Sequence, residues 1–96
     1  MQHHIASKLV AGWNARPVEQ RRYDGSQQPV KTVVLDFPND SYVTRVAFHT
    51  LAHRADAMLV RATNWRCEDE PDGVFAIEDC RKFYSQLLKA GFVRTA

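Results

Sequence analysis

Two histidines and a cysteine near the middle of the chain have the spacing that most resembles a metal site. His49 and His53 are four residues apart, so on a helix both imidazoles would lie on one face, and Cys67 offers a third donor. Structural zinc sites use four ligands, commonly with cysteines in CxxC pairs, and the sequence has no CxxC motif. We therefore predict no metal and no cofactor, and we expect both histidines to face solvent.

The same residues offer little for nucleophilic catalysis. A Cys67 thiolate would need His49 or His53 as its base. Six carboxylates lie between Cys67 and Cys80, and their negative charge opposes formation of a thiolate. The sequence also lacks a phosphate-binding glycine loop, a GxSxG motif and a dinucleotide fingerprint. These observations predict a protein that is not an enzyme.

Charge is sorted into blocks along the chain. Residues 67–80 include six Asp or Glu and no Lys or Arg. Residues 1–66 have nine Lys or Arg against five Asp or Glu, and residues 81–96 have four against none. Neighbouring fields of opposite sign are typical of a surface that binds a partner, or of two parts of one fold that neutralise each other.

We predict that the protein binds another protein by surface contact, as a regulatory or inhibitory accessory protein. Nine of its thirteen cationic residues are Arg, a residue enriched in binding hot spots. The predicted contacts are a basic stripe and an acidic hairpin tip, formed by Arg45, His49, His53, Arg61, Glu68, Asp69, Glu70 and Asp72.

Nucleic-acid binding is the alternative. Basic residues of a predicted first hairpin would join the basic stripe in contacting phosphates: Arg16, Arg21, Arg22 and Lys31. Trp13 could stack on an unpaired base. The net charge is only +2, however, and the acidic tip would repel phosphate. Protein binding is therefore the favoured prediction.

Length and composition predict a single globular α+β domain over residues 1–96. The chain is 45% hydrophobic and 25% charged, with only four Gly and four Pro. Nothing near its start resembles an export signal, and no apolar run reaches membrane-spanning length. We therefore expect a cytoplasmic protein with reduced thiols and no membrane contact.

The clearest predicted element is a helix over 77–90. Its apolar residues share one arc: Ile77, Cys80, Phe83, Tyr84, Leu87, Leu88 and Ala90. Glu78 and Asp79 suit the positive end of the helix dipole, and Gly91 followed by Phe92 predicts a glycine stop. Cys80 is then a buried apolar residue.

Turn motifs predict two hairpins. Asp24-Gly25-Ser26 separates a strand over 18–23 from a strand over 30–37. Glu70-Pro71-Asp72-Gly73 separates a strand over 64–67 from a strand over 74–77. Residues 5–13 fit either a helix or a strand, and the alternation favours a strand.

The segment 41–62 decides the topology. As one helix it places Arg45, His49, His53 and Arg61 opposite an apolar face. Its content of Ala, Arg, Met and Leu favours this helix, and the fold is then two β-hairpins and two helices packed on one antiparallel sheet. Two valines of the segment fall on the polar side, which leaves an alternative: a helix that stops near residue 54, a strand over 57–63, and a βαβ crossover in the middle.

Overall fold

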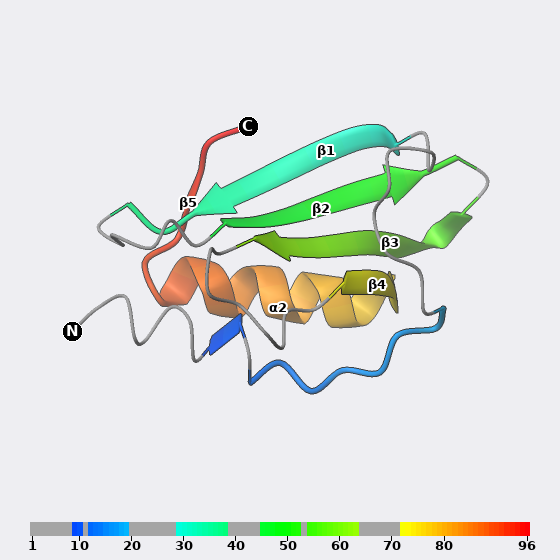
Figure 1. The fold of residues 1–96 in the computed structure, drawn as a ribbon, viewed down its shortest axis with the longest axis horizontal. Helices are drawn as coiled ribbons and strands as arrows, with labels where there is room; N and C mark the ends of the chain where they lie inside the picture. Colours follow the sequence, from blue (N-terminus) through cyan, green and yellow to red (C-terminus); the bar gives the residue numbers. More distant parts are fainter. Residues whose placement is uncertain (1–8, 11, 20–28, 39–44, 53, 64–71) are drawn as a thin grey trace.

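A five-stranded antiparallel sheet with one helix on its face organises the protein (Figure 1). The computed structural model describes residues 9–10, 12–19, 29–38, 45–52, 54–63 and 72–96. Along the chain the elements are β1 (Pro29–Asp36), β2 (Arg45–Leu51), β3 (Arg54–Thr63), β4 (Asp72–Ala76), α2 (Ile77–Lys89) and β5 (Val93–Arg94). In space the strand order is β4-β3-β2-β1-β5, with every neighbouring pair antiparallel.

The helix predicted over 77–90 is confirmed as α2. Cys80, Phe83 and Leu87 are its buried residues, spaced so that they share the side facing the sheet. The helix ends in a Schellman motif: the Phe92 amide donates to the Leu87 carbonyl at 3.0 Å, and the Gly91 amide donates to the Leu88 carbonyl at 3.1 Å. Gly91 has φ of 108°, a conformation that glycine adopts without strain.

The helix predicted over 41–62 is wrong, because β2 and β3 of that region form a hairpin. Phe48 lies opposite Val60 in this antiparallel pair. Val46 and Val60, which did not fit the predicted helix, are fully buried in the strands. The alternative was correct in placing a strand over 57–63, but its βαβ crossover is also wrong, since β2 and β3 are adjacent and antiparallel. Where two sheet-packed helices were predicted, the described residues have one, α2.

The described residues test the two predicted hairpins only in part. The strand predicted over 30–37 is confirmed as β1, and its described neighbours are β2 and β5. Glu19 instead forms an isolated bridge with Val74 at the β4 edge. β4 pairs with residues 57–61 of β3, and its predicted partner, residues 64–67, lies outside the described residues. Residues 20–28 and 64–71, which include the two predicted turns apart from Asp72 and Gly73, lie outside the described residues.

The main core lies between the sheet and α2. It includes Leu35, Phe48, Val60, Phe75 and Phe83, all less than 4% exposed. A smaller cluster of Ala57, Leu59 and Val74 is also buried. It lies on the other face of the sheet, because alternate residues of a strand point to opposite faces.

The N-terminal segment packs against the helix side of the molecule. Leu9 and Val10 are helical, so the strand predicted over 5–13 is wrong at these residues. The Trp13 indole is stacked on the Phe83 ring, with centroids 4.1 Å apart and planes 4° from parallel. It also lies 4.4 Å from the Phe75 ring. Among the described residues, no helix has the length and apolar character needed to cross a membrane.

Candidate functional site

Two clefts flank α2, one on each side of the helix. Asp79, Lys82 and Gln86 line the first, and Ile77, Arg81 and Tyr84 are among the residues that line the second. At about 100° per residue these two sets point to opposite sides of the helix. The core residues of α2 lie between them, facing the sheet. We call the two the Trp13 cleft and the Tyr84 groove.

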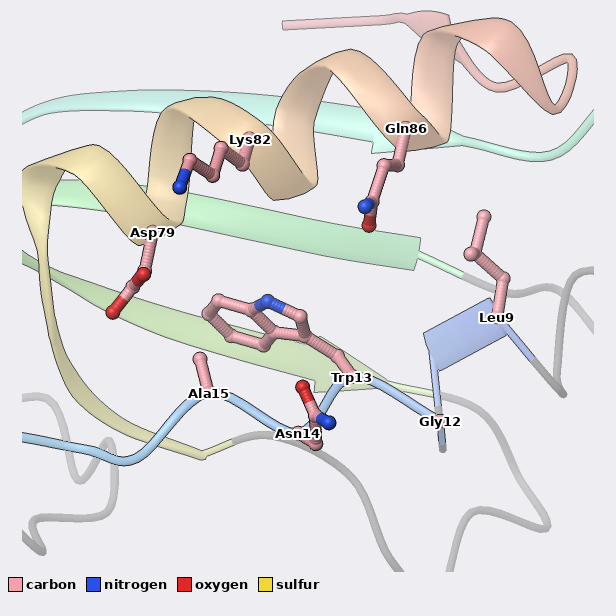
Figure 2. A pocket seen from close by; sticks show the side chains of 8 residues that line it. All are labelled: Leu9, Gly12, Trp13, Asn14, Ala15, Asp79, Lys82 and Gln86. Carbon is pink, nitrogen blue, oxygen red and sulfur yellow. The ribbon is translucent and has the colours of Figure 1, made fainter.

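The Trp13 cleft is polar. It has a volume of about 320 Å³ and is lined by Leu9, Gly12, Trp13, Asn14, Ala15, Asp79, Lys82 and Gln86. Figure 2 shows Asp79 and Gln86 extending from α2 toward the segment that carries Trp13. An acid, an amine and two amides therefore surround one aromatic ring. The indole is held by its stacking on Phe83, so it has a structural role as well as a place in the cleft wall.

The Tyr84 groove is mainly apolar and has a volume of about 310 Å³. Its lining combines three strands with one side of α2: Val33, Phe48, Met58, Ile77, Cys80, Arg81, Tyr84 and Ser85. Phe48 and Tyr84 make an edge-to-face contact with centroids 5.7 Å apart. Arg81 is exposed and is the one charged residue of this lining.

The Cys80 thiol, which lines the Tyr84 groove, does not have the properties of a nucleophile. The thiol is buried and donates to the Phe75 carbonyl at 3.7 Å. Burial, with a smaller contribution from the negative charge of Asp79, raises the pKa of Cys80 to about 12. The thiol is therefore protonated at neutral pH, as expected for a buried apolar residue and not for a nucleophile.

The described residues of the predicted basic stripe lie on the sheet face that α2 does not cover. Arg45 and His49 are on the same side of β2, and Arg61 of β3 lies opposite Ala47, between them. Arg45 donates to both carboxylate oxygens of Asp36, at 2.7 and 3.1 Å. This contact is the main cause that lowers the pKa of Asp36, and the hydroxyl of Thr95 also donates to the same carboxylate.

His49 is buried, so the prediction that it faces solvent is wrong. Only 7% of the residue is exposed, and its Nδ1 lies 2.8 Å from the Thr32 hydroxyl oxygen. Burial lowers the pKa of His49, and the positive charge of Arg61 lowers it further. The neutral imidazole is thus part of the structure of the sheet face.

The remaining predicted contacts are placed only in part. Asp72 begins β4, at the edge of the sheet away from β1. His53, Cys67, Glu68, Asp69 and Glu70 lie outside the described residues. Within the described parts of the chain, no group of three or more His, Cys, Asp or Glu residues is arranged to hold a metal ion.

No family model, curated protein or solved structure matches this chain. The assignment of a site therefore depends on the geometry of the protein itself. The described lining residues of the two clefts include no His, and the Tyr84 groove also has no carboxylate to act as a base. The Tyr84 groove combines a mainly apolar lining with a single cation, Arg81.

Sequence reasoning missed the Tyr84 groove. Phe48 and Met58 were placed on a predicted helix, so their contact with one side of α2 was not foreseen. One signal was available: Val46 and Phe48 alternate with His49 and Arg45 in a way that suits a strand with two unlike faces. That alternation would have directed Phe48 toward α2.

Proposed function

We propose that this protein is a small, non-catalytic binding domain that contacts another protein through the Tyr84 groove, in a regulatory or inhibitory role. The observation that carries the proposal is the combination of an apolar groove with one charged residue, Arg81, at its lining. Arg81 forms no ion pair with the described residues. A partner that inserts an apolar side chain and places a carboxylate beside Arg81 would satisfy both features.

The chemistry of the groove favours a protein over a nucleic acid. Nucleic-acid binding depends on several cations that each contact a phosphate. The Tyr84 groove has one cation, and two arginines elsewhere are already engaged: Arg45 with Asp36 and Arg54 with Glu19. A mainly apolar surface with a single charge is typical of the centre of a protein interface.

The test uses two neighbouring cations of α2 that line different clefts. Arg81→Glu reverses the charge at the Tyr84 groove, and Lys82→Glu makes the same change at the Trp13 cleft. Both variants have the same net charge, so a general electrostatic effect would change them equally. The partner is first identified by chemical cross-linking in nuclease-treated native lysate, then purified, and its affinity is measured for the parent chain and both variants.

We expect Arg81→Glu to weaken the complex by about tenfold or more, because a charged hydrogen bond is lost and a repulsion is added. Lys82→Glu should bind like the parent. Equal losses in both variants would contradict the choice of groove. Loss of every cross-linked partner after nuclease treatment would replace protein binding with nucleic-acid binding.

A further inference from the structure

We infer that the partner segment is an extended strand that adds to the open half of β1 and directs alternate side chains toward the Tyr84 groove. This inference depends on the proposed function, since it names the kind of partner segment that the groove receives. It comes from a second observation, the hydrogen bonding along the outer edge of β1.

Among the described residues, β1 is covered along only part of its outer edge. Its inner edge pairs with β2 from Pro29 to Asp36. On the outer edge, β5 pairs only with Leu35 and Asp36 (Figure 1). The last outer contacts are those of Val34, whose amide donates to the Ala96 carbonyl at 3.1 Å and whose carbonyl accepts from Thr95 at 2.9 Å. From Pro29 to Val33, no strand of the described residues covers this edge.

The backbone of Thr32 faces this open edge. The amide and carbonyl of Val34 point outward to the C-terminal segment, and residues two apart in a strand point the same way. Lys31 points inward instead, because its amide and carbonyl both bond to the Thr50 hydroxyl of β2, at 2.9 and 3.2 Å. Thr32 therefore presents an outward donor and acceptor with which no described strand pairs, and such a pair is a template for another strand.

The open edge and the groove share a residue. Val33 belongs to the open half of β1, and its side chain lines the Tyr84 groove together with Phe48. A strand added beside β1 would lie about 4.8 Å away, with every second side chain on the same face as Val33. Val30, 72% exposed, adds apolar surface on the same stretch of β1. One extended segment can therefore bond to Thr32 and reach the groove.

A second copy of this chain fits the edge less well. If β1 paired with its own copy about Thr32, each Val30 would lie opposite a Val34 of the other copy. The outer edge of Val34 is already bonded to Thr95 and Ala96. The pairing would have to displace Thr95 and Ala96 in both copies, whereas a foreign segment needs only the stretch that no described strand covers.

The test compares two substitutions of Thr32. Thr32→Pro removes the outward amide hydrogen without removing a bond to β2, because that amide points away from β2. Thr32→Val is the matched control: it also loses the hydroxyl contact with His49 but keeps the amide hydrogen. The probe is a phage-displayed library of random dodecapeptides selected on the full chain, and enriched peptides are then synthesised for affinity measurements.

We expect the enriched peptides to alternate apolar residues and to include a carboxylate. They should bind Thr32→Val and Lys82→Glu like the parent, and lose about tenfold in affinity for Thr32→Pro and for Arg81→Glu. Methylating single backbone amides of a peptide should weaken binding at every second position only. This series uses the parent chain, so it holds even if Thr32→Pro fails to fold.

Four results would overturn the inference. Peptides that lose affinity for Arg81→Glu but not for Thr32→Pro, with no alternating effect of methylation, would leave groove binding without strand addition. Affinities unchanged in both variants would remove the proposed groove as well. Failure to enrich any peptide, or dimerisation of the parent chain that Thr32→Pro abolishes, would replace the extended segment with a folded surface or a second copy.

Discussion

The Trp13 cleft and the Tyr84 groove have nearly equal volumes, about 320 and 310 Å³, yet they differ in what forms them. The Trp13 cleft lies where the N-terminal segment meets α2, and its aromatic ring is stacked on the core. The Tyr84 groove lies where α2, which packs on β3 and β4, leaves part of β1 and β2 uncovered. Two clefts of similar size therefore differ in role. The Trp13 cleft is where the N-terminal segment packs on α2, and the Tyr84 groove is a candidate binding surface.

Trp13→Ala should give the largest effect on stability, and it tests whether the Trp13 cleft has a structural role. The free energy of unfolding should fall by about 3 to 5 kcal/mol, because the indole loses its contacts with Phe83 and Phe75. Urea denaturation followed by circular dichroism measures the change, with the exposed Asn14→Ala as a neutral control. A decrease of less than about 1 kcal/mol in the free energy of unfolding would mean that the packing of Trp13 contributes little to stability.

Cys80 reports on the floor of the Tyr84 groove. In a Cys67→Ser chain, its thiol should react with a disulfide reagent at pH 8 at least about a hundredfold more slowly than in the unfolded chain. The reason is that burial raises the pKa of Cys80 to about 12 and hides the sulfur. Absorbance of the released thiol measures the rate. Fast labelling of the native chain would show that solvent enters below Phe48.

His49 lies away from both clefts, on the other face of the sheet, and predicts a pH dependence of stability that neither cleft causes. Its pKa is lowered in the folded chain by burial and by Arg61, so the unfolded chain takes up a proton first as the pH falls below about 6.5. Stability should therefore fall between pH 7 and pH 5, by at most about 1.4 kcal/mol per pH unit for one proton.

The control for this slope is His49→Gln, which should flatten the decrease over the same pH range. Urea titrations at each pH measure it. Asp36 acts at lower pH, because the hydrogen bond from Arg45 lowers the pKa of its carboxyl from the ordinary value. An unchanged slope in His49→Gln would assign the acid sensitivity to another group.

The two charge reversals should have the smallest effect on stability. Arg81 and Lys82 are both exposed, and surface substitutions of this kind usually change the free energy of unfolding by less than about 0.5 kcal/mol. Thermal melts of Arg81→Glu and Lys82→Glu should therefore superimpose. A large loss in Arg81→Glu alone would mean that the groove flank is also structural, and its binding defect would then need the Thr32 variants for support.

Part of the fold could be predicted from sequence because its causes are local. The apolar period of α2, its acidic first turn and the glycine stop at Gly91 all lie within one short segment, and the structure has them as expected. The strand at β1 also followed from its Val-rich run. Residues 45–63 could not be assigned this way, because their Ala and Arg content favours a helix while the pairing of Phe48 with Val60 stabilises a hairpin.

The candidate site depends even more than the fold on residues that are far apart in the sequence. Arg81 and Tyr84 were both placed on the predicted helix, but the groove also needs Val33, Phe48 and Met58 from three strands. His49 illustrates the same limit, since its burial depends on the sheet and not on its neighbours in sequence. The predicted acidic tip from Glu68 to Glu70 stays a prediction.

By itself the sequence determined α2, its end at Gly91 and an α+β composition, since hydrogen bonds between near neighbours and an amphipathic period need no distant partner. Only the tertiary structure decided the strand order, the partners of β1 and β4, and which side of α2 stayed open. Those outcomes depend on contacts between residues far apart in the chain, where the gain from burying Phe48 and Val60 outweighs local helix propensity.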